Sequence, residues 1–284
     1  MDACPATPMA LNKANAGTAI RREWKAAAPP IYFASVTKYR FSRMAGQGTT
    51  KKIAIVQSNY IPWKGYFDLI NGVDDFVFYD DMQYTRRDWR NRNMIKTPAG
   101  LKWLTIPVDV KGKYLQKIRE TQVSDPGWAQ QHLSSLTHNY ARAPHFKAYR
   151  DAIADLYARA ESEPLLSRIN RMFVEWICGE LGIGTRLHWS MDFPLAEGKS
   201  ERLLGLCVAL GATHYVSGPA ARDYLDESLF ESAGVTVEFI DYGGYPEYPQ
   251  LHGPFEHGVT ILDLLLNVGP DAPKYMKSMA RRRQ

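Results

Sequence analysis

The strongest constraint on the fold lies between Ile53 and Asp81, where two strand patterns flank one helix pattern. Residues 53–57 form a short β-branched run, and residues 74–81 form a second apolar run bounded by acidic residues. Residues 63–73, which follow Pro62, carry large apolar side chains at helical spacing. Strands joined through a helix run parallel, because a tight turn connects only antiparallel neighbours. We therefore expect a parallel sheet built around this unit.

The rest of the chain repeats the alternation of strands and helices. Further strands are predicted at 101–110, 185–190, 213–218 and 235–241, and further helices at 199–210, 220–225 and 260–269. Residues 124–182 show only helical patterns. We therefore predict an α/β protein. It has a mostly parallel sheet with flanking helices, of the Rossmann-like, nucleotide-binding α/β type, with an all-helical insertion at about 124–182.

The charge distribution divides the chain into three parts. Nine Lys and Arg against two Asp and Glu give residues 1–52 a net charge of +7, and five against one give residues 271–284 a net charge of +4. Residues 53–270 carry 21 basic and 27 acidic side chains, a net charge of −6. The sequence thus predicts a flexible extension over 1–50, one domain over 51–270 and a basic tail over 271–284. A mildly acidic domain argues against nucleic acid as a partner.

Several classes of protein are excluded by composition. No apolar run approaches the roughly 18 residues that a membrane-spanning helix needs, so no membrane span is predicted. The three cysteines are odd in number and widely spaced, which argues against a disulfide framework and favours a reducing cytoplasm. His252, Glu256 and His257 are close together but lack the HExxH spacing of zinc sites, so no metal is predicted. The pattern indicates no particular cofactor.

Polar residues follow the predicted strands, where parallel sheets bind ligands. Gln57 and Asn59 follow the first strand, and Lys64 lies near the start of the next helix, where free backbone N–H groups favour anions. The alternative is that this turn only caps the helix and packs its aromatic side chains. Ser217 ends a later strand, and Arg222 and Tyr224 follow it. These two side chains would either face a ligand or cover the sheet.

A basic segment lies after the second strand. Five Lys and Arg occupy eleven positions over 86–96, with Asp88 as the only acid among them. Arg90 and Arg92 suit phosphate or carboxylate, because the guanidinium group donates two parallel hydrogen bonds, and Asn93 adds a further donor. The alternative is a charged loop that only faces solvent. We predict a site for an anionic ligand here.

Seven short motifs, in order, resemble the WbqC-like protein family. They are IAIVQSNYIPWKGYFDLI, RNRNMIK, LTIPV, HNYARAPHF, THYVSG, YLD and TILDLLLNVG, and they extend from about residue 52 to 269. Many members have Gln-Pro where this chain has Gln57-Ser58. The resemblance implies a place in O-antigen or other surface polysaccharide synthesis, with transfer of glycine, another aminoacyl group or another acyl group.

Three functions follow from these features. The first is a transferase acting on an anionic, nucleotide- or lipid-linked sugar. Lys64 and Arg90 would hold phosphate, and Asn59 or His214 would act as the catalytic group that orients or deprotonates the acceptor. The second is an ATP- or CTP-dependent ligase or nucleotidyltransferase, although the HxGH signature of the similar nucleotidylyltransferases is absent. The third is a non-catalytic binding protein of a polysaccharide assembly system.

Overall fold

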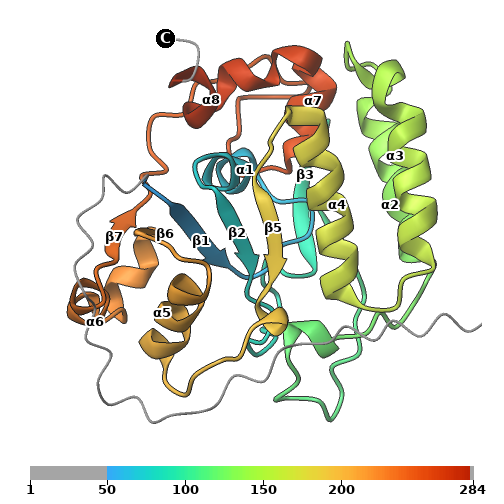
Figure 1. The fold of residues 1–284 in the computed structure, drawn as a ribbon. Coiled ribbons are helices and arrows are strands. Elements are labelled where there is room, and N and C mark those ends of the chain that lie inside the picture. Colours follow the sequence, from blue (N-terminus) through green and yellow to red (C-terminus); the bar gives the residue numbers. More distant parts are fainter. Residues whose placement is uncertain (1–49, 282–284) are drawn as a thin grey trace, which may run out of the picture. The chain divides into compact units, whose positions relative to one another are not determined.

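The structure is a computed structural model that describes residues 50–281 (Figure 1). Apart from its last residue, the extension predicted over 1–50 lies outside the described residues. The main sheet has five parallel strands in the order β5-β2-β1-β6-β7. Their bounds are Lys52–Val56 (β1), Asp75–Phe78 (β2), Arg186–Trp189 (β5), His214–Ser217 (β6) and Thr236–Phe239 (β7). The prediction of an α/β protein with a mostly parallel sheet is confirmed.

The strand order changes direction at β1. Along the chain, β2 and β5 are added on one side of β1, whereas β6 and β7 are added on the other. Numbered along the chain within this sheet, the order is 3-2-1-4-5, as in the dinucleotide-binding folds. The carboxyl ends of β1 and β6 therefore flank a switch point, which is the ordinary ligand position of such sheets.

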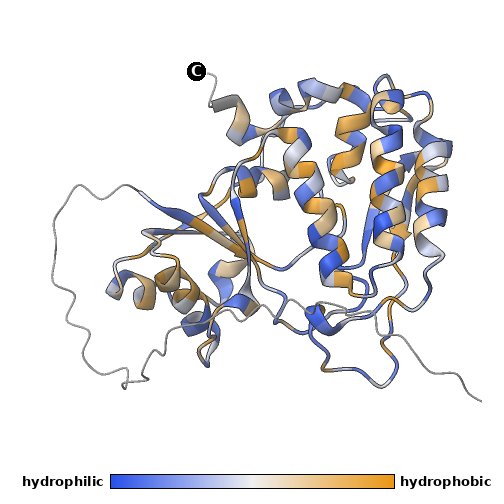
Figure 2. Ribbon diagram, turned by 45° about the vertical axis from the view of Figure 1, so that its right-hand side comes forward, coloured by the Kyte–Doolittle hydropathy of each residue, from blue (hydrophilic) through white to orange (hydrophobic). Residues whose placement is uncertain are grey.

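Helices cover both faces of the sheet, because alternate residues of each strand point to opposite faces. Phe76 and Phe78 of β2 belong to a core with α1 (Lys64–Asn71) and α4 (Leu166–Leu181). Val77, between them, belongs to a second core with α5 (Lys199–Ala209) and α6 (Glu227–Ser232). Figure 2 shows orange and blue residues alternating along the helices, as amphipathic helices require.

A two-stranded antiparallel hairpin lies apart from the main sheet. β3 (Arg92–Thr97) pairs with β4 (Gly100–Thr105) through a turn at Pro98 and Ala99. Residues 92–96 of the basic segment are therefore strand, which neither the predicted anionic site nor the alternative of a solvent-facing loop had anticipated. The strand predicted at 101–110 exists only as far as Thr105 and belongs to this hairpin. Charged residues in both strands, among them the buried Lys96, hid the alternating pattern.

The region predicted as helical insertion contains α2 (Trp128–Tyr140), α3 (Phe146–Glu161) and α4. Helices α2 and α3 pack side by side, as Figure 1 shows, and α4 reaches the main sheet. Short 3₁₀ turns are found at Ile118–Glu120, Ser190–Asp192 and Pro219–Asp223. The last of these replaces the helix predicted at 220–225.

The end of the described chain packs against the domain. Helix α7 (Ile261–Val268) leads into a 3₁₀ segment, Gly269–Tyr275, and α8 (Lys277–Arg281). The backbone N–H groups of Lys277 and Ser278 donate to the Asp68 carboxylate, at 2.9 and 2.8 Å. Residues 271–281, placed in a basic tail from their charge, thus carry regular structure. Within residues 50–281, we find no helix with the length and apolar character that a membrane crossing requires.

Candidate functional site

A cavity of about 680 Å³ opens at the switch point, and we call it the switch-point cavity. Its walls come from the carboxyl ends of β1 and β6, the residue after β2, the first turn of α5 and the loop after β7. Its lining is largely apolar and aromatic with a few polar groups, which is typical of small-molecule sites. The lining residues used below are Gln57, Tyr79, Gly198, Lys199, Arg202, Tyr215, Ser217, Tyr224 and Tyr242.

The first turn of α5 brings positive charge to this cavity. Gly198 precedes the helix with φ +93° and supplies no side-chain cap, so the first N–H groups of α5 keep no side-chain partner at that end. The ammonium group of Lys199 has no hydrogen bond or ion pair with any described residue. Arg202 donates from Nε to the carbonyl oxygen of Ala196 at 2.8 Å. Free backbone donors and two cations make this wall suited to an anion.

Tyrosine side chains from other elements line the rest of the cavity. Burial raises the pKa of Tyr79, and the Arg202 guanidinium beside it acts in the opposite direction. The Tyr215 hydroxyl lies 3.2 Å from Ser217 Oγ, and its ring stacks on Phe230. Burial also raises the pKa of Tyr242 to about 12. These hydroxyls stay protonated at neutral pH and can donate hydrogen bonds to a ligand.

Three residues predicted from the strand ends line the switch-point cavity: Gln57, Ser217 and Tyr224. Lys199 and Arg202 line it as well but were not predicted as site residues. The signal for them was available, because Gly198-Lys199-Ser200 opens a helix in the way that phosphate-binding turns do. The segment before this helix shows no strand pattern, so the turn did not stand out.

A smaller cavity of about 290 Å³ lies on the other side of the turn after β1, and we call it the tryptophan cavity. Asn59 and Asn93, both predicted as site residues, line it together with His257. The remaining lining residues are Pro62, Trp63, Trp89 and Gly258. The structure therefore separates the predicted residues between two neighbouring cavities.

The guanidinium groups of Arg90 and Arg92 contact other groups of the protein. Arg90 donates to the carbonyl oxygen of Ser58 at 3.5 Å and to Asn59 Oδ1, and it lies 3.6 Å from the Asp88 carboxylate. The Arg92 guanidinium lies over the Trp103 ring, 4.1 Å from the ring centre, and donates to the carbonyl oxygen of Arg87. Neither residue lines the switch-point cavity or the tryptophan cavity.

Lys64 is enclosed, with only 3% of the residue exposed. Its Nζ donates to the carbonyl oxygen of Pro246 at 2.7 Å and lies 5.0–5.6 Å from the ring centres of Tyr245, Tyr248 and Phe255. Burial lowers the pKa of Lys64 to about 8. The aromatic loop between β7 and α7 thus covers the ammonium group that was predicted to hold phosphate.

Neither His214 nor Arg222 lines either cavity. His214 begins β6, at the opposite end of that strand from Ser217, and its Nδ1 lies 2.9 Å from Thr213 Oγ1. The Arg222 guanidinium lies 4.7 Å from the centre of the Phe239 ring. The structure does not bring His214 close to Asn59, the other residue predicted to be catalytic, so the two cannot share one acceptor.

A buried polar network, which the sequence did not reveal, holds the turn after β1. Asp80 accepts from the Ser58 backbone N–H at 2.8 Å and from Ser167 Oγ. Asn170 of α4 donates to Ser58 Oγ at 3.0 Å and to the Arg90 carbonyl oxygen at 2.9 Å. Burial raises the pKa of Asp80. This network fixes the turn that both cavities share.

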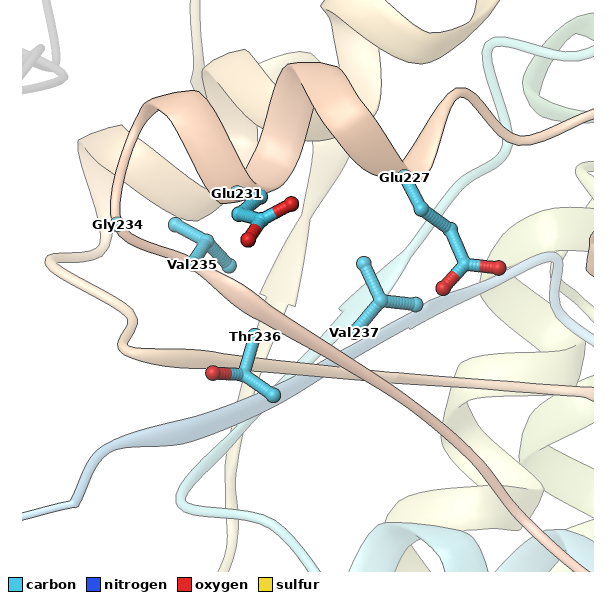
Figure 3. A pocket seen from close by; sticks show the side chains of 6 residues that line it. All are labelled: Glu227, Glu231, Gly234, Val235, Thr236 and Val237. Carbon is cyan, nitrogen blue, oxygen red and sulfur yellow. The ribbon is translucent and has the colours of Figure 1, made fainter.

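A third cavity, of about 410 Å³, lies between α6 and the edge strand β7 (Figure 3). Glu227 and Glu231 line one side, and Figure 3 shows their carboxylates near Val235, Thr236 and Val237. Its acidic lining is unsuited to the anionic ligand that the sequence predicts. Within residues 50–281, no group of three or more His, Cys, Asp or Glu side chains is arranged to hold a metal ion.

The fold is a doubly wound α/β fold with a cavity at the switch point of its parallel sheet. The chain belongs to the WbqC-like protein family, whose model matches residues 57–275. It is 55% identical over 227 residues to an uncharacterized protein of Mycobacterium tuberculosis. The aligned region covers 80% of this chain and 98% of that protein. No solved structure matches the chain.

Proposed function

We propose that this protein is a transferase that binds an anionic, nucleotide-linked sugar in the switch-point cavity. The observation that carries the proposal is the joint placement of Lys199, Arg202 and the first turn of α5 at the carboxyl ends of β1 and β6. A phosphate group would lie against this wall, where charged donors and free N–H groups meet. The tyrosines would contact the planar or apolar part of the ligand.

Membership of the WbqC-like family supports the rest of the proposal. We propose that the transferred group is an aminoacyl group, such as glycine, or another acyl group, and that the product enters surface polysaccharide such as O-antigen. The substrate-holding role passes from Lys64 and Arg90, which are bonded internally, to Lys199 and Arg202.

Thermal melting of the full chain with UDP-sugars, dTDP-sugars, ATP and CTP, with and without magnesium, tests the proposal. A ligand at about 100 times its dissociation constant adds about 2.7 kcal/mol, which corresponds to several degrees. We expect a nucleotide-sugar to raise the melting temperature of the wild type but not of the double variant Lys199→Ala, Arg202→Ala. The matched control is Lys147→Ala with Arg168→Ala, two exposed cations on α3 and α4.

The other functions predict different results. A shift with ATP or CTP alone, together with magnesium-dependent pyrophosphate release, would favour a ligase or nucleotidyltransferase. Binding of a nucleotide-sugar without turnover of any acyl donor would favour a binding protein of a polysaccharide assembly system. An equal shift in the wild type and the Lys199, Arg202 double variant would remove the switch-point cavity from the proposal.

A further inference from the structure

The tryptophan cavity is built differently from the switch-point cavity. Its lining combines two indole rings with two side-chain amides and one imidazole, and it includes no Lys, Arg, Asp or Glu. Its volume of about 290 Å³ lies at the lower limit of the roughly 300–1,000 Å³ typical of ligand pockets. Such a cavity has room for one ring and favours a neutral ligand that offers both an apolar face and hydroxyl groups.

The turn that forms the floor of this cavity is strained and firmly held. Ile61 adopts φ +36°, a conformation that β-branched residues rarely take. The Asn93 side chain donates to the carbonyl oxygens of Tyr60 and Ile61, at 3.2 and 2.8 Å. The Tyr60 backbone N–H donates to the Trp89 carbonyl oxygen at 3.0 Å. Strain that the surroundings hold in place is typical of binding and catalytic sites.

Both indole rings are fixed in position. A Cβ atom on residue 65 would lie 2.2 Å from the Trp63 ring, so Gly65 is what allows this ring to lie against the helix backbone. On the other wall, Trp89 packs against Trp103 with ring centres 5.4 Å apart. Trp89 remains 42% exposed. A large aromatic side chain that is fixed but still open to solvent is suited to stacking against a ligand ring.

Two polar groups at the cavity have unused hydrogen-bonding capacity. Asn59 accepts from Arg90 through Oδ1, whereas its Nδ2 group has no partner among the described residues. His257 Nδ1 is buried without a hydrogen-bond partner, and burial lowers the pKa of this imidazole, with Lys64 as the next cause. Buried polar atoms are nearly always paired in native proteins. Because protein atoms close Nδ1 off from solvent, the nitrogen that can meet a ligand in the cavity is Nε2, which has no hydrogen bond to a described residue.

We propose that the tryptophan cavity is a subsite for one neutral sugar ring, which stacks on Trp89 and donates or accepts hydrogen bonds at Asn59 and His257. Its role as the acceptor subsite rests on the proposed transferase function, whereas sugar binding itself does not. The two cavities adjoin, because Trp63 of one contacts Tyr242 of the other with ring centres 5.3 Å apart. Gln57 and Asn59, two positions apart on one turn, face one cavity each.

Fluorine NMR of the full chain labelled with 5-fluorotryptophan tests this subsite. The variants Trp63→Phe and Trp89→Phe assign the two resonances. Methyl glycosides of glucose, galactose, rhamnose and N-acetylglucosamine are then titrated to millimolar concentration. We expect at least one of them to move the Trp89 resonance in a saturable manner. Trp89→Ala and Asn59→Ala should each weaken its binding about tenfold or more, which corresponds to about 1.4 kcal/mol.

Controls separate this proposal from the proposed function. Tyr114→Ala removes another exposed aromatic side chain, 79% exposed and outside the cavity lining, and should leave glycoside binding unchanged. UDP should bind equally well to the wild type and to Trp89→Ala. The subsite is refuted if no methyl glycoside moves either resonance, or if Trp89→Ala and Asn59→Ala bind the glycoside as the wild type does. If glycosides bind but no nucleotide does, the sugar subsite stands and the proposed nucleotide-sugar substrate fails.

Discussion

Helices α1 and α5 both begin with lysine, and these two lysines have opposite surroundings. Lys64 opens α1 and Lys199 opens α5, and neither helix has a side-chain cap at its start. Lys64 is 3% exposed beneath an aromatic loop, whereas the ammonium group of Lys199 is exposed and unpaired among the described residues. A cation at a helix start is therefore available to a ligand only where later parts of the chain leave it uncovered.

Replacement of the two lysines by alanine should give the largest contrast. Lys64→Ala leaves a cavity among three aromatic rings and an unpaired Pro246 carbonyl oxygen. We expect it to lower the free energy of unfolding by about 3–4 kcal/mol. Lys199→Ala should change it by less than about 0.5 kcal/mol. Urea denaturation of both variants measures the difference, and equal losses would contradict the comparison.

The second largest expected effect is a difference in the pH dependence of stability between the wild type and a variant without Lys64. The pKa of Lys64 is about 8 in the folded protein against 10.5 for an ordinary lysine. Between these values the unfolded chain binds more protons than the folded protein, so the free energy of unfolding rises with pH. The gain is at most about 3 kcal/mol. Urea denaturation at pH 7 to 10.5 should show it in the wild type relative to Lys64→Met, and parallel curves would refute it.

Ligand affinity should depend on the lysine and arginine of α5 alone. Arg202→Ala should weaken binding of a nucleotide-sugar by about 10- to 100-fold, since charge-assisted hydrogen bonds contribute about 1.5–3 kcal/mol. Lys64→Met, which keeps the side-chain volume, should leave this affinity unchanged. Isothermal titration calorimetry measures the affinity of both variants for the nucleotide-sugar. A loss of affinity in Lys64→Met would return the phosphate-holding role to α1.

The glycine before α5 and the glycine within it, Gly198 and Gly205, give the smallest expected effect. Gly198 has φ +93°, and an added Cβ would lie 2.1 Å from the Glu201 carboxylate. Gly198→Ala should cost about 1–2 kcal/mol. Gly205→Ala, inside α5 and with nothing within 4 Å of the added Cβ, should instead stabilise by about 0.5–1 kcal/mol. Thermal melting of both variants checks this. An unchanged melting temperature in Gly198→Ala would mean that the turn before α5 adapts to the added methyl group.

The parallel sheet could be predicted from the sequence because its strands are buried apolar runs with polar ends. The hairpin was missed at β3, since Arg92, Met94 and Lys96 obscure the buried Asn93 and Ile95. Burial of this charged strand depends on packing against helices that are distant in the sequence. The local sequence pattern does not encode such long-range contacts.

The site could be predicted only where it follows strand ends. Gln57 and Ser217 line the switch-point cavity because parallel strands bring their carboxyl ends together. Lys64 was misplaced because its cover comes from Tyr245 to Phe255, about 180 positions further along the chain. The separation of Asn59 from Gln57 depends on which way each side chain leaves the turn, which composition does not encode.

The central position of β1 also governs the order in which this protein can assemble. β1 leaves the ribosome before every other strand of the sheet, yet its partner β6 lies far along the chain: Lys51 bonds Thr213, 162 positions later. At about 5–20 residues per second, translation takes roughly 10–30 s to cover that interval. Until then one edge of β1 has no partner, and the switch-point cavity lacks the walls that β6 and the loop after β7 supply. The switch-point cavity is therefore completed only late in synthesis, after β6 and the loop that follows β7 have been made.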